Sequence, residues 1–170
     1  WETDEVKADA ATKGFYNATL TLKNIKATAG ILTDVFGYRF LQQEGNRFRF
    51  ITDNVEAANV IDLLEIPGMP AGRNAGGTNH HIAFRVKDEN IQMELREKIA
   101  GLGLNPTGKI NRDYFFSVYF REPGGVLFEL ATDNPGFTVD EPLAELGSHL
   151  KLPKQFESAR KQIEKVLPSI

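Results

Sequence analysis

The stretch YFFSVYFREPGGVLFELAT, residues 114–132, predicts two strands joined by a tight turn. Apolar residues alternate with other residues on both sides of a Pro-Gly-Gly sequence, which is typical of a hairpin with one buried face. The expected core positions are Phe116, Val118, Phe120, Val126, Phe128 and Leu130. The intervening residues, among them Ser117, Tyr119 and Glu129, are then expected on the opposite face of the same strands.

A strand and a helix precede this hairpin. The sequence HHIAFRV, residues 80–86, has the same alternation and places His81 opposite its apolar face. Asp88 can cap a following helix that ends near Gly101. The apolar residues expected on that helix are Ile91, Leu95 and Ile99. Another strand-like segment, residues 105–112, leads to the hairpin, so the order is strand, helix and three strands.

The first half of the chain repeats this order. The segment FYNATLTL, residues 15–22, alternates like a half-buried strand, and residues 24–37 have helical spacing. Three short strand-like runs follow within residues 38–66. The repeat has a period of about 64 residues, the separation of Asn17 from His81, which indicates an internal duplication.

We therefore expect an α+β fold of two tandem βαβββ modules. The modules form a cupped mixed β-sheet with flanking helices, and a C-terminal helix follows. The expected divisions are a linker at 1–14, a first module at 15–66, a connector at 67–77, a second module at 78–136 with the metal-ligand positions, and a tail at 137–170 that carries the helix.

The composition narrows the class of protein. The 170 residues are 41% hydrophobic, with a net charge of −3 and a pI near 5.7, so neither nucleic acid nor an anionic membrane is an expected partner. No apolar run approaches the ~18 residues of a membrane span. The absence of cysteine excludes a thiolate metal site and fits a reducing cytoplasm, which is the expected compartment.

Three chemistry-bearing residues share the face opposite the core. His81, Tyr119 and Glu129 converge on a cavity if the sheet that their strands form is curved. Imidazole nitrogen and carboxylate oxygen suit Fe(II), Mn(II), Zn(II) or Ni(II), and a site of two histidines and one carboxylate leaves positions for oxygen and substrate. Alternation alone leaves a second interpretation open, in which His81 and Glu129 are solvated residues on an exposed face.

The whole pattern resembles the vicinal oxygen chelate superfamily, which includes glyoxalase I, extradiol dioxygenases and fosfomycin-resistance proteins. The resemblance rests on the duplicated unit, on HHIAFRV at 80–86 and on EPGGVLFELATDNPGF at 122–137. Within the superfamily, the chain looks most like the glyoxalase-like ring-cleaving dioxygenases of hydroquinones, which carry four such units. The resemblance implies that this chain holds the third and fourth units. The chain begins with Trp1 and not Met, which also leads us to expect a fragment or a processed product.

The resemblance also implies roles for individual residues. His81 and Glu129 match two ligands of an Fe(II) ion, with Mn(II) or another divalent metal as the alternative. His80 matches a histidine that helps to bind substrate and can carry a proton. Arg112 and Tyr119 match polar residues that contact the substrate and stabilise negative charge. The implied substrates are a small aromatic diol and O2.

The third ligand of that family belongs to the first unit, which is not in this sequence. The implied partner is therefore the N-terminal half of the same parent protein, or a second copy of this chain. Two other functions stay open. One is a metal-free glyoxalase-like module that binds small molecules, and the other is a glyoxalase-type metal isomerase or lyase. The isomerase needs a second carboxylate, for which Asp62 or Glu65 would have to serve.

Overall fold

The computed structural model of the protein describes residues 2–168 and contains two four-stranded sheets. The first sheet consists of β1 (Asn17–Leu22), β2 (Arg39–Glu44), β3 (Arg47–Ile51) and β4 (Val60–Glu65). The second consists of β5 (Ile82–Val86), β6 (Ile110–Asn111), β7 (Phe116–Arg121) and β8 (Leu127–Thr132). The helical segments are α1 (Lys26–Gly30), which continues as a π-helix (Ile31–Val35), α2 (Glu89–Gly101) and, near the C-terminus, α3 (Arg160–Glu164). The segment after β8 also contains short 3-10 helices at Phe137–Val139, Leu143–Glu145 and Lys154–Ala159.

Both modules have the same strand order. The sheets run β1-β4-β3-β2 and β5-β8-β7-β6, and the first strand of each module pairs in parallel with the last. This arrangement confirms the α+β fold of two βαβββ modules with a short C-terminal helix. Backbone pairing gives each module a sheet of its own. Strand β5 begins at Ile82, so His80 and His81 lie immediately before the strand.

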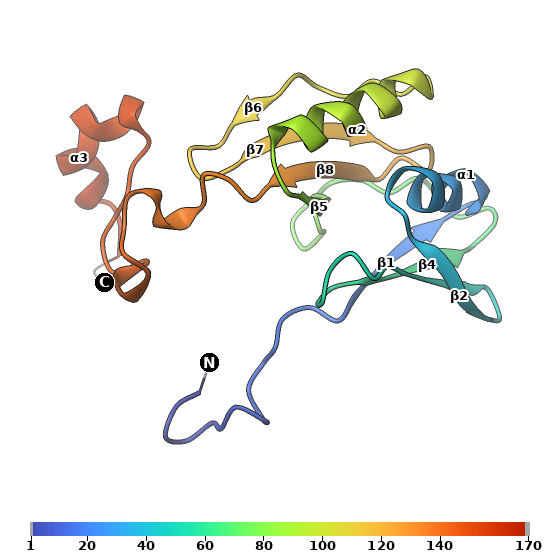
Figure 1. Ribbon diagram of the computed structural model, residues 1–170, viewed down its shortest axis with the longest axis horizontal. Helices are drawn as coiled ribbons and strands as arrows, with labels where there is room; N and C mark the ends of the chain where they lie inside the picture. Colours follow the sequence, from blue (N-terminus) through green and yellow to red (C-terminus); the bar gives the residue numbers. More distant parts are fainter. Residues whose placement is uncertain (1, 169–170) are drawn as a thin grey trace.

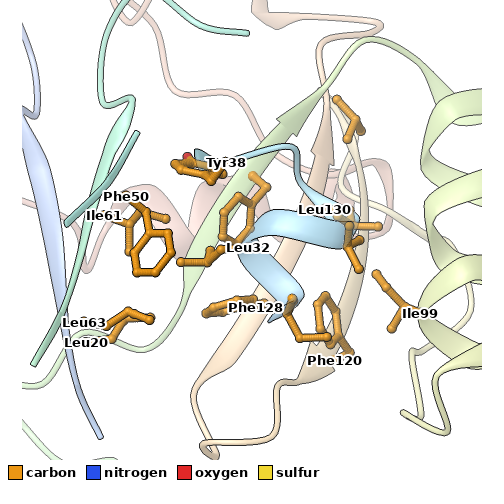
Figure 2. Close-up of a cluster of buried hydrophobic side chains, with 14 of the residues drawn as sticks. Leu20, Leu32, Tyr38, Phe50, Ile61, Leu63, Ile99, Phe120, Phe128 and Leu130 are labelled. Carbon is orange, nitrogen blue, oxygen red and sulfur yellow. The ribbon is translucent and has the colours of Figure 1, made fainter. Parts of the chain in front are cut away.

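One apolar core joins the two modules. Figure 2 shows Leu32 of the π-helix between Leu20, Phe50, Ile61 and Leu63 of the first sheet and Phe120, Phe128 and Leu130 of the second. Leu32, Leu63, Phe128 and Leu130 are fully buried. Because a single cluster spans both sheets, the two modules are expected to unfold together.

Specific contacts fix the first helix against the second module. Phe36 stacks on Phe84, with ring centroids 3.9 Å apart. The Thr28 hydroxyl donates a 2.5 Å hydrogen bond to the buried carboxylate of Glu122. A Cβ atom on Gly124 would lie 2.4 Å from a methyl carbon of Leu22, so the β7–β8 turn approaches β1 too closely for any larger residue.

Helix α2 follows the predicted capping pattern but not the predicted burial. The Asp88 side chain accepts hydrogen bonds from the backbone N–H groups of Asn90 and Ile91. Ile99 is fully buried as expected, whereas Ile91 is exposed and Gln92 is buried in its place. Gln92 is tolerated there because its Nε2 donates to the carbonyl oxygens of two strands of the sheet.

Helix α2 lies along one face of the second sheet, and α1 lies beside the strands of the first (Figure 1). The buried apolar side chains of both sheets point into the shared core, so the helices leave the opposite face of each sheet open. None of the helices within residues 2–168 is long and apolar enough to span a bilayer.

Candidate metal centre and substrate face

The open face of the second sheet gathers the candidate residues because three strands lie in register. Glu129 on β8 pairs with Ala83 on β5 and with Tyr119 on β7. His81 precedes Ala83 by two residues and therefore projects from the same face. The predicted convergence of His81, Tyr119 and Glu129 is present in the structure, and the rings of His81 and Tyr119 meet edge to face at 5.7 Å.

Glu129 and His81 form a close pair of potential ligands. His81 Nε2 lies 2.7 Å from Glu129 Oε2. The Glu129 side chain is only 3% exposed, while that of His81 is 33% exposed. The second carboxylate oxygen, Oε1, is buried and has no hydrogen-bond partner among the described residues. A buried carboxylate oxygen without a donor is costly, and such groups are found where a cation or another function compensates.

The geometry of this pair fits a shared divalent cation. Two ligand atoms at about 2.0–2.2 Å from one metal lie about 3 Å apart when the bonds are near a right angle. His81 Nε2 and Glu129 Oε2 would therefore need to separate only slightly. Within residues 2–168, however, no group of three or more His, Cys, Asp or Glu side chains could hold a metal. The described part of the chain thus brings two potential metal ligands together, and no third one with them.

His80 contacts His81 on the side away from Glu129. The two Nδ1 atoms lie 3.0 Å apart, and the rings are perpendicular. This contact holds the His81 ring with its Nε2 directed towards Glu129. Metal-binding histidines commonly have their second nitrogen held in this manner.

Arg112 crosses the open face from the loop before β7. Its Nε donates to Ser117 Oγ at 3.2 Å, and its Nη2 donates to the Tyr119 hydroxyl at 3.4 Å. The guanidinium also lies 5.6 Å from the centre of the Tyr119 ring. Among the described residues, Arg112 therefore forms no ion pair with a surface carboxylate. It places a positive charge and the Tyr119 hydroxyl together beside His81 and Glu129.

The corresponding position in the first module is filled by an arginine cluster. Asp62 occupies the place of Glu129 in the duplicated unit and is fully buried. Arg49 Nε donates to its Oδ1 at 2.8 Å, and Arg47 Nη1 and Asn17 Nδ2 donate to its Oδ2 at 3.0 and 2.9 Å. The two hydrogen bonds from Arg49, and then the one from Arg47, lower the pKa of Asp62 below its ordinary value.

These contacts weaken the isomerase interpretation. The Asp62 oxygens already accept four hydrogen bonds, from Arg47, Arg49 and Asn17. A Glu65 oxygen accepts the backbone N–H of Ile25 at the start of the first helix. Asp62 is therefore not free to act as a second metal-binding carboxylate, and one oxygen of Glu65 is already engaged at the start of the first helix.

The sequence profile of the glyoxalase/bleomycin resistance protein/dioxygenase superfamily matches residues 10–130. The chain belongs to this superfamily. Among relatives, a Bacillus subtilis (strain 168) protein named provisionally as the ring-cleaving dioxygenase MhqO is 41% identical over 98% of this chain and 53% of its own length. The chlorohydroquinone/hydroquinone 1,2-dioxygenase of Sphingobium indicum is 34% identical over 96% of this chain and 51% of its own length.

A solved structure supports the same membership. The crystal structure of a provisionally named dioxygenase from Bacillus subtilis matches 99% of this chain and 54% of its own chain, with 41% identity and a TM-score of 0.90. The chain spans about half the length of the curated relatives it matches.

Sequence reasoning missed two features of the site. It did not single out Ser117, which is fully buried and accepts the Arg112 hydrogen bond. Alternation in residues 114–121 placed Ser117 on the ligand face but gave no sign of its partner. It also left open whether Asp62 was free, although Arg47 and Arg49 alternate along β3 as residues of the open face should.

Proposed function

We propose that this chain is the C-terminal half of a ring-cleaving dioxygenase that acts on hydroquinone- or catechol-type aromatics, with His81 and Glu129 as two ligands of an Fe(II) ion. The observation that carries the proposal is the Glu129 carboxylate, which is buried with one oxygen unpaired and the other 2.7 Å from His81 Nε2. The name of the 34% identical hydroquinone 1,2-dioxygenase supports the reaction class. Mn(II) or another divalent metal is the alternative.

In this proposal a bound Fe(II) would act as a Lewis acid towards a phenolic oxygen and supply the redox chemistry for dioxygen. His81 and Glu129 would hold the metal at the edge of the open face, where His81 remains partly exposed. Two protein ligands leave several coordination positions for substrate, dioxygen and a further protein ligand.

The neighbouring side chains would bind and orient the aromatic diol. Arg112 and the Tyr119 hydroxyl lie 3.4 Å apart, so both can donate hydrogen bonds to one ring oxygen and stabilise the negative charge that develops there. His80 is exposed and contacts His81, so it would exchange a proton between solvent and the site.

A third protein ligand would come from outside the described residues. The relatives are about twice as long as this chain, and the other half of such a protein or a second copy of this chain could supply the ligand. The open face of the second sheet would be the surface that this partner approaches.

Oxygen uptake with hydroquinone tests the proposal. The protein is loaded with Fe(II) under anaerobic conditions, mixed with hydroquinone and oxygen, and followed by an oxygen electrode and by the loss of aromatic absorbance. We expect one O2 to be consumed for each ring opened. Glu129→Gln should abolish this consumption, and the matched variant His149→Ala, on an exposed histidine of the tail, should retain it.

A second function, the metal-free binding module, is favoured by the absence of a three-ligand group within residues 2–168. Iron-loaded protein that consumes no oxygen with hydroquinone would contradict the dioxygenase proposal for this chain. If the protein binds an aromatic diol but takes up no iron, the chain is a metal-free binding module.

A further inference from the structure

The guanidinium of Arg112 contacts two uncharged oxygens on the open face of the second sheet. Its Nε donates to Ser117 Oγ at 3.2 Å, and its Nη2 donates to the Tyr119 hydroxyl at 3.4 Å. We infer that Ser117 is a positioning residue, which holds the Arg112 guanidinium beside Tyr119 and leaves its positive charge available to an anionic oxygen of the substrate. The inference rests on the proposed function, in which that oxygen belongs to an aromatic diol.

The turn between β6 and β7 places Arg112 diagonally across from Ser117. Ile110 pairs with Ser117, and the backbone N–H of Arg112 donates to the carbonyl oxygen of Phe115 at 2.9 Å. Arg112 follows Ile110 by two residues and therefore projects from the face that carries Ser117. Asp113 at the tip of the turn has a φ of 66°, a conformation that aspartate tolerates better than most residues. The backbone thus directs the Arg112 side chain towards Ser117, and the serine hydroxyl has only to hold the guanidinium.

Ser117 is buried on a face that is otherwise partly open. Its exposure is 0%, whereas Tyr119 and Ala131 on the same face are partly exposed and Arg112 is exposed. A buried hydroxyl needs a hydrogen-bond partner, and Arg112 Nε provides one. The cross-strand neighbour of Ser117 on β8 is Ala131, whose small side chain leaves room for the arginine. An arginine side chain has many rotamers, so an acceptor at its Nε reduces the number of positions that the guanidinium can take.

The two modules show the difference between a charged and a neutral acceptor. In the first module, Arg49 Nε and Nη2 donate to the two oxygens of Asp62 at 2.8 and 2.9 Å, so the carboxylate neutralises the guanidinium. In the second module, the same two donor atoms of Arg112 meet the hydroxyls of Ser117 and Tyr119. A hydroxyl orients a guanidinium without cancelling its charge, and a charge held in place stabilises an anion that develops beside it. A serine therefore suits a site for a phenolic oxygen better than a carboxylate would.

Nuclear magnetic resonance of the metal-free chain tests the positioning separately from catalysis. The ¹⁵N-labelled protein is studied in the presence of a chelator, and the Arg112 Nε–H signal is assigned by its loss in Arg112→Lys. Ser117→Ala should raise the hydrogen-exchange rate of this group by about threefold or more, because the hydrogen bond to the buried hydroxyl is removed. Ser117→Thr should preserve the slower exchange. The matched variant Ser148→Ala, on an exposed serine of the tail, should leave it unchanged.

Oxygen uptake by the iron-loaded chain tests the role of the charge. Ser117→Ala should lower kcat with hydroquinone about tenfold at unchanged iron content, and Ser117→Thr should restore it. Ser117→Asp should lower kcat at least as much, although its Arg112 Nε–H signal still exchanges slowly, because the new carboxylate holds the guanidinium and neutralises it. A residue with only a structural role would not separate the exchange rate from kcat in this way.

Two results would overturn the inference. Unchanged exchange of the Arg112 signal in Ser117→Ala would exclude the positioning role, and full oxygen uptake by Ser117→Asp would exclude the need for an uncompensated charge. If Ser117→Asp does not fold, the comparison of Ser117→Ala with Ser117→Thr decides the effect on kcat. If the unaltered iron-loaded chain consumes no oxygen, the proposed function fails for this chain, and the Arg112 signal still decides whether Ser117 positions the guanidinium.

Discussion

Two glutamates of this chain are equally buried but differ in how many hydrogen bonds their carboxylates accept. We therefore expect the same substitution to change the free energy of unfolding in opposite directions at the two positions. Glu129 and Glu122 are each 2% exposed. Glu129 Oε1 has no hydrogen-bond partner among the described residues. Both Glu122 oxygens accept hydrogen bonds, from Thr28 and from two backbone N–H groups of the β7–β8 turn. Replacement by leucine keeps each position filled and removes only the carboxylate.

The magnitudes follow from these contacts. Removing the unpaired buried oxygen of Glu129 recovers about 1–3 kcal/mol, and losing the contact with the partly exposed His81 costs about 1 kcal/mol. We therefore expect Glu129→Leu to raise the free energy of unfolding of the metal-free chain by about 1 kcal/mol. Glu122→Leu leaves three donors without an acceptor and should lower it by about 3 kcal/mol.

Urea unfolding in the presence of a chelator, followed by circular dichroism, measures both changes. With a slope of about 1–3 kcal/mol per molar urea, Glu129→Leu should raise the midpoint by about 0.3–1 M at unchanged slope. A Glu129→Leu protein that is destabilised by more than about 1 kcal/mol would refute the reasoning. It would mean that Glu129 is satisfied in the absence of a cation.

Three further predictions concern other parts of the molecule. Because the pKa of Asp62 is lowered in the folded state, its stabilising effect is complete above the unfolded value near 3.8 and is lost as the pH falls through the folded value. Asp62→Asn should therefore lose stability relative to the unaltered chain at pH 6 and approach it at pH 3, and a constant difference across that range would contradict the assignment. Gly124→Ala should lower the free energy of unfolding by about 1–3 kcal/mol, because its Cβ would lie 2.4 Å from a Leu22 carbon, whereas Gly108→Ala, with open space around it, should change it little in the same urea titration. Tyr119→Phe should reduce hydroquinone-dependent oxygen uptake by the iron-loaded chain at least tenfold without reducing its iron content, and full uptake would exclude Tyr119 from charge stabilisation.

Alternation predicted most of the fold and the face of the second sheet that carries His81 and Glu129. Phe84, Val118 and Phe128 are buried as their spacing required, and His81 and Glu129 meet on the other face. These features depend on local periodicity, which a strand expresses directly in sequence. The duplication predicted the repeated βαβββ module, and the structure gives each module a sheet of its own.

Contacts between distant segments could not be predicted in this way. The sequence gives Glu122 the place of an ordinary turn residue, yet its carboxylate accepts a hydrogen bond from Thr28 of the other module. Gln92 is buried because its side chain donates hydrogen bonds to two strand carbonyls. Its apolar neighbour Ile91 is exposed. Such pairings depend on how the modules pack, and periodicity carries no information about them.

The partner of Arg112 was likewise hidden from the sequence. Periodicity gives no partner for an arginine in a loop, but the side chain crosses the sheet to Ser117 and Tyr119. In the first module, the position of Tyr119 across from the buried carboxylate carries Arg49, which pairs with Asp62. The repeated fold thus contains one carboxylate neutralised by arginine and one left with an unpaired oxygen.

Iron content tests the central claim most directly. Three proteins are loaded with Fe(II) without oxygen, desalted and analysed for iron per chain. They are the unaltered chain, His81→Ala and the matched control His149→Ala. The account predicts bound iron in the unaltered chain and in His149→Ala, and its loss in His81→Ala. Equal iron in all three proteins, or none in the unaltered chain, would contradict the assignment of His81 and Glu129 as metal ligands.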